Sequence, residues 1–294
     1  MFENPSAELA RAVTRQFVLV TEADRMGYDE IWIGEHHGDA VWPSASVMTL
    51  LGFAAGVTKH ARLGPATLLP AWHDAQRVAE DVATLDLLSK GRFNFAVSRG
   101  ARWAAQRRDD AHEQMFASLA QIERLLDGTT PGLVPKPSQA KIPVWIGSKT
   151  PAVIARAAAS GHGLMVAATA RPAEVHERLA LYRAAAPAHE PRLVLPRFAQ
   201  TMETRDEALA VARPYLQAFV ERLRGFGLTP PDVDELLAMS LIGSHAEVAE
   251  KLAKLQTEFN PHSIPIVPTS AQFDTVKRCL ADFMDEVRPL LPED

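Results

Sequence analysis

Residues 27–39 read Gly-Tyr-Asp-Glu-Ile-Trp-Ile-Gly-Glu-His-His-Gly-Asp, an apolar run that ends directly in ionisable side chains. The run Ile31-Trp32-Ile33 is β-branched and aromatic and follows a glycine turn, which is typical of a buried strand. Glu35, His36 and His37 come immediately after it, at the carboxyl end of that strand. Because successive side chains of a strand point to opposite faces, at most one of the two histidines is expected to face a central pocket.

Strands and helices alternate on both sides of this stretch. Apolar positions from Ser6 to Met26 recur at three- and four-residue steps and predict an amphipathic helix in front of it. Further helices are predicted over residues 43–57, 75–88, 109–126, 151–159, 172–185, 206–224, 244–257 and 271–290, and strands over residues 30–34, 61–69, 92–98, 142–147, 164–168, 192–200 and 263–267. Such alternation implies parallel strands with right-handed crossovers, so we predict a single α/β domain over residues 1–294.

The number of strands bears on the architecture. The seven predicted strands are each followed by a helix, whereas a closed (β/α)8 barrel needs eight and a doubly wound sheet needs no fixed number. No Gly-x-Gly-x-x-Gly follows any strand, which counts against a Rossmann fold. We therefore expect a (β/α)8 TIM barrel whose first strand is short, altered or missing, since only Met1 to Pro5 precede the first helix.

Composition excludes several classes of protein. The 294 residues are 47% hydrophobic and 23% charged, which is enough to bury a large core. The net charge of −5 gives no broad basic field, so neither nucleic acid nor a membrane surface is an expected partner. The lone Cys279 excludes internal disulfides. Together with the absence of a signal pattern or a long apolar run, it predicts a cytoplasmic location.

In a parallel barrel all strand-to-helix loops open on one face, where such folds keep their active sites. Three of the five tryptophans, Trp42, Trp72 and Trp103, fall in these loops and, together with His37, predict a pocket for a flat and partly apolar substrate.

Two of the same loops suit an anion. Ser148-Lys149-Thr150 precedes a helix and so combines hydroxyls, a cation and free backbone N–H groups. Arg99, one loop earlier, can fork onto the same phosphate. The alternative is an ordinary helix cap beside a solvated lysine.

The order and spacing of several motifs resemble the bacterial luciferase-like flavin monooxygenases. The motifs are Gly27-Tyr28-Asp29-Glu30-Ile31-Trp32-Ile33-Gly34-Glu35-His36-His37, Leu63-Gly64-Pro65-Ala66, Arg77-Val78-Ala79-Glu80-Asp81, Leu85-Asp86-Leu87-Leu88-Ser89-Lys90-Gly91-Arg92-Phe93, Ser98-Arg99-Gly100, Pro143-Val144-Trp145-Ile146-Gly147 and Leu241-Ile242-Gly243-Ser244.

This resemblance implies a luciferase-like barrel that takes reduced FMN from a separate reductase. The enzyme would react the flavin with O2 to a flavin hydroperoxide and oxidise a small organic substrate, and a homodimer is implied as well. By resemblance His36 acts in proton transfer. The residues implied to bind the cofactor are Glu35, Ala66, Thr67, Ser98, Arg99, Ser148, Lys149 and Thr150, with a non-proline cis peptide near Ala66-Thr67.

Two other functions stay open: an F420-dependent oxidoreductase that transfers hydride, and a flavin-binding protein without turnover. A structural role is expected for His37 and His73, and a place in the core for Trp32 and Trp145. A metal site made of Glu35, His36, His37 and Asp39 is disfavoured, because these residues lack the helical i, i+4 spacing of metal ligands. No metal is therefore expected.

Overall fold

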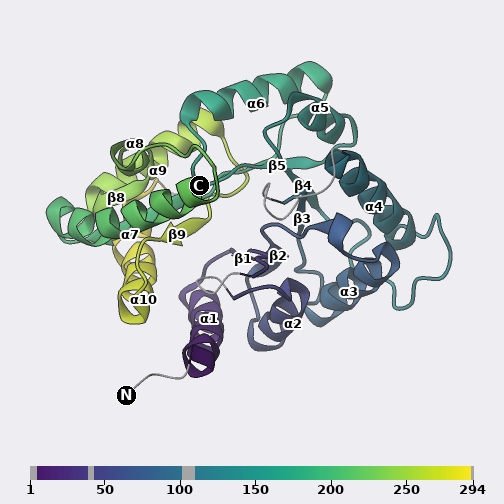
Figure 1. The fold of residues 1–294 in the computed structure, drawn as a ribbon, viewed down its shortest axis with the longest axis horizontal. Helices are drawn as coiled ribbons and strands as arrows, with labels where there is room; N and C mark the ends of the chain where they lie inside the picture. Colours follow the sequence, from purple (N-terminus) through teal and green to yellow (C-terminus); the bar gives the residue numbers. More distant parts are fainter. Residues whose placement is uncertain (1–4, 39–42, 101–109, 293–294) are drawn as a thin grey trace. The chain divides into compact units, whose positions relative to one another are not determined.

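The computed structural model describes residues 5–38, 43–100 and 110–292 (Figure 1). The chain forms two compact units, Met1–Val153 and Ile154–Asp294. Within the described residues, none of the helices has the length and apolar character needed to cross a bilayer.

The first unit alternates strands and helices. Its elements are α1 (Pro5–Met26), β1 (Glu30–Ile33), α2 (Val47–Val57), β2 (Arg62–Pro65), the 3-10 turn η1 (Pro70–Trp72), α3 (Ala75–Leu88), β3 (Phe95–Ser98), α4 (Ala111–Leu126) and β4 (Val144–Gly147), followed by the start of α5 (Pro151–Ala159). Within the described residues α1 is the first element, and no strand precedes it there, as the expectation of a short, altered or missing first strand allows.

The four strands of this unit run parallel. β1 pairs with β2, and β3 pairs with β4 so that Ser98 lies opposite Gly147. Isolated bridges between Leu63 and Phe93 and between Leu68 and Val97 connect the two pairs. The carboxyl ends of all four strands therefore lie side by side.

One face of these strands carries two tryptophans, and we call it the Trp face. Trp32 of β1 and Trp145 of β4 meet edge to face, with ring centroids 5.6 Å apart and planes at 86°. Gly64 of β2 lies beneath Trp32, because a Cβ there would come within 2.7 Å of the indole ring. The prediction that Trp145 is a core residue is confirmed, since it is 1% exposed, and Trp32 is half-buried.

The turn between α3 and β3 contains two residues with a left-handed backbone. Lys90 and Gly91 both adopt left-handed φ values, 58° and 79°, which confirms the predicted glycine stop after α3. Arg92 then donates hydrogen bonds to the backbone carbonyl oxygens of Thr58, Ala61 and Ser89. These contacts fix the start of the third strand region against the turn before β2.

Asp24 binds the backbone of the turn in front of β2. Its carboxylate accepts hydrogen bonds of 2.8 Å from the backbone N–H groups of Lys59, His60 and Ala61. Burial raises the pKa of Asp24, but these three donors outweigh it and hold the pKa below its ordinary value. The carboxylate thereby joins the end of α1 to the start of β2.

The second unit contains the remaining elements. They are β5 (Gly163–Met165), α6 (Pro172–Ala185), β6 (Leu193–Val194), β7 (Arg197–Met202), α7 (Arg205–Gly225), α8 (Val233–Met239), β8 (Leu241–Ser244), α9 (His245–Phe259), β9 (Ile266–Pro268), α10 (Phe273–Asp282), the π turn η2 (Phe283–Val287) and the 3-10 turn η3 (Arg288–Leu290). β7 lies between β8 and β9, parallel to both.

The alternating parallel strands and helices confirm the α/β fold class, but the predicted strand count is wrong. The described residues hold nine strands, because the strand predicted over 192–200 is two strands, β6 and β7, and β8 was not predicted. Pro196 lies between β6 and β7, where its missing N–H interrupts a ladder. No helix therefore follows β6 directly. Pairings among the described strands do not close into a ring.

Candidate functional site

The carboxyl ends of β1 to β4 present small residues on the Trp face. Alternation places Gly34 two residues beyond Trp32 and Gly147 two residues beyond Trp145 on this face, with Ala66 two residues beyond Gly64 and Ser98 paired with Gly147. A Cβ on Gly147 would come within 3.2 Å of both Ser98 Cβ and Thr67 Cγ2. The strand ends therefore bring backbone and small side chains close together.

The side chain of His36 lies over Gly34. A Cβ added to Gly34 would fall 2.7 Å from His36 Nε2 and 3.5 Å from the carbonyl oxygen of Ala66. The imidazole of His36 is thus beside the ends of β1 and β2, whereas His37 bonds to Glu35. The prediction that the two adjacent histidines point differently is confirmed.

Thr67, which follows β2, contacts Ser98, the last residue of β3. Their hydroxyl oxygens are 2.5 Å apart, and the N–H of Gly100 donates to Ser98 Oγ at 3.2 Å. The peptide bond between Ala66 and Thr67 is cis, which confirms that prediction. Ser98 thereby links the strand end to the loop that carries Arg99.

Two cations follow neighbouring strands. Because Ser98 pairs with Gly147, Arg99 and the loop of Lys149 start side by side. Arg99 is half-buried and Lys149 is exposed. Burial, and then the positive charge of Arg99, lower the pKa of His112 on α4.

The loop of Lys149 also leads into a helix. The N–H of Thr150 donates to Ser148 Oγ at 3.1 Å, and α5 begins at Pro151. Ser148 therefore shapes the turn in front of α5, and the bond it accepts comes from Thr150 and not from an N–H of the helix. The start of α5 still offers the positive end of a helix dipole beside two cations, as an anion site requires.

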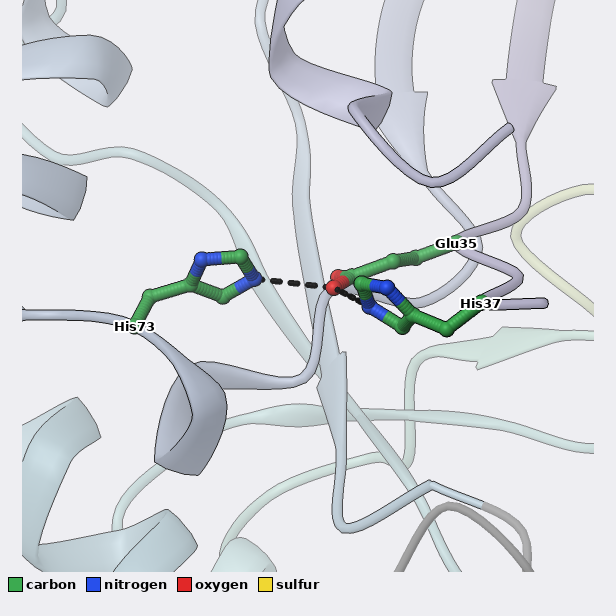
Figure 2. Close-up of side chains that lie close together, drawn as sticks. All are labelled: Glu35, His37 and His73. Atoms are coloured by element: carbon green, nitrogen blue, oxygen red, sulfur yellow. Dashed lines mark hydrogen bonds and ion pairs between the residues drawn. The ribbon is translucent and has the colours of Figure 1, made fainter. Parts of the chain in front are cut away.

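Glu35, His37 and His73 form a second cluster (Figure 2). Oε1 of Glu35 lies 2.7 Å from His37 Nε2 and 2.8 Å from His73 Nε2. Oε2 accepts the N–H of Leu69 at 2.8 Å. The Glu35 side chain is 0% exposed, whereas those of His37 and His73 are 28% and 34% exposed. The carboxylate is therefore used by internal donors, and the predicted contact of Glu35 with a cofactor stays a prediction.

The charges in this cluster favour each other. Burial raises the pKa of Glu35, but hydrogen bonds from His73, the Leu69 N–H and His37 more than offset it, so the pKa lies below its ordinary value. The hydrogen bond to Glu35 raises the pKa of His73, and this effect exceeds that of burial. Ionised Glu35 and protonated His73 therefore stabilise each other.

This linkage sets an expected pH window. Glu35 contributes to the free energy of unfolding in full above pH 4.5, its ordinary pKa. This contribution is lost as the pH falls through the lowered pKa of the folded state. His73 contributes in full below pH 6.5, its ordinary pKa. This contribution is lost as the pH rises through the raised pKa of His73 in the folded state. Glu35→Gln should thus lower the free energy of unfolding by about 1.5–3 kcal/mol inside this window and by less on either side. Urea unfolding at several pH values measures the difference, and a loss that does not vary with pH would contradict the linkage.

Two of the residues predicted to line the substrate pocket, Trp72 and His37, lie together, and the pocket itself stays a prediction. Trp72 is 50% exposed, and its ring stacks on His37 with centroids 5.1 Å apart and planes at 14°. Trp42 and Trp103 lie outside the described residues, as does Asp39. Of the four residues considered for a metal site, Glu35 and His37 meet, whereas His36 lies over Gly34.

The sequence did not indicate that His73 joins Glu35. His73 is the residue between η1 and Asp74, the N-cap of α3, whose side chain accepts the Arg77 N–H. A proline turn on one side and a capped helix on the other fix its position, and both are readable in Pro70 and Asp74. Among the described residues, Glu35, His37 and His73 are the group whose donor atoms, all within 4.8 Å of one another, could hold a metal ion.

Comparisons with known proteins place these features in context. The sequence model of the luciferase-like monooxygenases matches residues 2–259. The chain is 25% identical over 293 residues to a luciferase-like monooxygenase of Escherichia coli K12, covering 89% of this chain and 88% of that protein. Two matches are shorter: limonene 1,2-monooxygenase of Rhodococcus erythropolis is 32% identical over 40% of this chain. The oxygenase component of a flavin-dependent trigonelline monooxygenase of Acinetobacter baylyi is 38% identical over 27% of it. The chain spans 32% and 22% of the lengths of these two relatives.

Solved structures share the fold. Monooxygenase RslO1 from Streptomyces bottropensis superposes with a TM-score of 0.82 at 22% identity, covering 96% of this chain and 94% of that one. The oxygenating constituent of 3,6-diketocamphane monooxygenase from Pseudomonas putida, in complex with FMN, has a TM-score of 0.77 at 16% identity, with 94% and 92% covered. The F420-dependent tetrahydromethanopterin reductase of Methanopyrus kandleri has a TM-score of 0.72 at 17% identity, with 95% and 96% covered.

Proposed function

The chain belongs to the luciferase-like monooxygenase family, and we propose that it is a two-component, FMNH2-dependent monooxygenase of a small organic substrate. The observation that carries the proposal is that Arg99 and the loop of Lys149 follow paired residues of β3 and β4, next to the small-residue strand ends. A reduced flavin mononucleotide needs both a binding site for its phosphate and backbone that can approach its flat ring.

The residues present fit such a group. Arg99, Lys149 and the start of α5 supply positive charge for a phosphate. A Cβ at Gly34 would displace the ring of His36 and one at Gly147 would crowd Ser98 and Thr67, whereas glycine leaves the backbone bare at both positions. When bound, the reduced flavin supplies the electrons that activate O2.

The chain's own residues would do three things. Arg99 and Lys149 would bind and orient the phosphate, while Ser98 and Thr67 hold the adjoining backbone. His36 would move a proton close to the ends of β1 and β2. Trp72, stacked on His37, would exclude water from the reacting atoms.

The partners and the assembly are part of the proposal. A separate flavin reductase is supported by the match to a protein named as an oxygenase component. A homodimer, a single domain over residues 1–294 and a cytoplasmic location remain predictions.

A second candidate is an F420-dependent oxidoreductase that transfers hydride, which the Methanopyrus kandleri fold relative favours. Because F420 also carries a phosphate, the cations near Arg99 suit either cofactor. Anaerobic titration with reduced FMN and with reduced F420 separates the two. Preferential binding of reduced FMN, followed by O2-dependent oxidation of a substrate, is the expected result. Binding of F420 alone, or of neither cofactor, would overturn the proposal.

Arg99→Ala is expected to weaken the binding of reduced FMN by about 10- to 100-fold. A hydrogen bond to a charged group contributes about 1.5–3 kcal/mol, and each 1.4 kcal/mol is tenfold in Kd. Anaerobic titration of flavin fluorescence measures the change. Arg77→Ala is the matched control, because Arg77 is an exposed arginine on α3 that pairs with Asp81. Equal affinities of the two variants would argue against a phosphate site at Arg99.

A further inference from the structure

The cluster of Glu35, His37 and His73 forms hydrogen bonds that the proposed cofactor site does not use. A fully buried carboxylate is costly unless its oxygens are bonded, and here one oxygen, Oε1, serves two imidazoles. Figure 2 shows Oε1 of Glu35 between the rings of His37 and His73, with a dashed line to each. The two rings come from different loops, after β1 and after η1.

The chemistry of an ionised carboxylate determines which ring nitrogen carries hydrogen. Lowering of the pKa of Glu35 keeps it ionised at neutral pH, and an ionised carboxylate only accepts hydrogen bonds. Each Nε2 near Oε1 must therefore carry a hydrogen and donate it. In a neutral imidazole the other nitrogen, Nδ1, is then the basic one.

The neighbouring charges act on the two rings differently. His73 faces Glu35 and also Asp81 of α3, and Asp81 in turn faces Arg77 and Glu80. His37 faces Glu35 and stacks on Trp72. His73 is thus the ring placed to hold a positive charge near solvent, and His37 is the ring placed next to the exposed indole.

We propose that Glu35 is a positioning residue that directs Nε2–H of both His37 and His73 at its oxygen Oε1, so that each imidazole exchanges protons only through Nδ1. His37 then presents a basic Nδ1 beside Trp72, where it takes a proton from a bound substrate or gives one back. On uptake the Nδ1–H bond forms as the donor's bond to hydrogen breaks, and on release the reverse occurs. No electrons are transferred. The use of this proton in catalysis rests on the proposed function, whereas the tautomers do not.

The geometry supports hydrogen bonding over metal binding at this cluster. A metal ion needs three donors directed at one empty point, with each about 2.0–2.2 Å from it. Here the two Nε2 atoms are directed at an oxygen of the third residue, at hydrogen-bond distances. A bound metal would also require both Nε2 atoms to lose their hydrogens.

Histidine ring spectra test the proposal on the full chain without cofactor. Long-range 1H–15N correlation of 15N-labelled protein reports which ring nitrogen carries hydrogen. His37→Gln and His73→Gln assign the signals. We expect the Nε2–H tautomer for both neutral rings, and we expect Glu35→Gln to lower the pKa of His73. His176 is the internal control, because its Nε2 lies 2.8 Å from Glu258 Oε1 in the second unit, and its signals should not change in Glu35→Gln.

Each alternative result has a definite meaning. An Nδ1–H tautomer at either ring, or a pKa of His73 unchanged in Glu35→Gln, overturns the proposal. Ring signals of the wild type that change on addition of EDTA would also overturn it, since they would show a bound metal. If Glu35→Gln does not fold, the tautomers of the wild type still decide. Failure to bind FMN would refute the proposed function and leave these spectra untouched.

Discussion

His36→Ala is expected to lower turnover by about 10²- to 10⁴-fold, the usual contribution of a positioned general acid or base. The imidazole lies over Gly34 and beside Ala66, at the ends of β1 and β2. The affinity for reduced FMN should change little, because Arg99 and Lys149 are retained. Product formed per enzyme, measured by mass spectrometry on any compound that passes a first product screen, gives the rate.

Two further variants separate position from chemistry. Gly34→Ala keeps His36, but its Cβ would fall 2.7 Å from Nε2 and must displace the ring. A rate between those of the wild type and His36→Ala is expected. His176→Ala removes an exposed histidine and should leave the rate unchanged. Normal turnover by His36→Ala would exclude His36 from proton transfer.

Trp145→Ala is expected to reduce the free energy of unfolding by about 3–5 kcal/mol, the range for truncating a large buried aromatic side chain. Trp145 is 1% exposed and lies edge-on to Trp32, which covers Gly64. The substitution therefore leaves a cavity next to side chains of β1 and β2, and the surrounding strands cannot close it. Urea unfolding followed by circular dichroism measures the loss.

The matched control is another tryptophan of the same unit. Trp72 is 50% exposed, so Trp72→Ala should cost no more than about 1 kcal/mol. Trp145→Phe should retain much of the stability, because most of the volume is kept. Equal losses for Trp145→Ala and Trp72→Ala would contradict the packing described for the Trp face.

Helices bounded by strong local signals could be predicted to the residue. α3, α5 and α6 begin and end where the sequence indicated. Pro151 and Pro172 stand at the first helical position of α5 and α6, and Asp74 caps α3. β8 was harder to predict, because its apolar pair Leu241-Ile242 follows α8 almost directly and a short buried apolar run can equally belong to a helix.

Residues of the site could be predicted where neighbouring strands present them. Arg99 and Ser148 follow paired strand residues, so the parallel order alone brings their loops together. The bond from Glu35 to His73 could not be predicted, because it depends on the path of the chain through η1. The small residues at the strand ends carry a readable signal, since Gly34, Ala66, Ser98 and Gly147 each stand at or directly after the last residue of a strand.

The guanidinium of Arg92 donates hydrogen bonds to the carbonyl oxygens of Thr58, Ala61 and Ser89. It therefore fixes the path of the main chain at this turn. A Ser-Lys-Gly-Arg-Phe segment in another protein therefore reports how that chain turns between a helix and a strand. The segment carries no information about the substrate of this protein or of the other one. Two proteins can agree letter for letter over this turn and take unrelated substrates, so substrates are better compared through the loops after the strands.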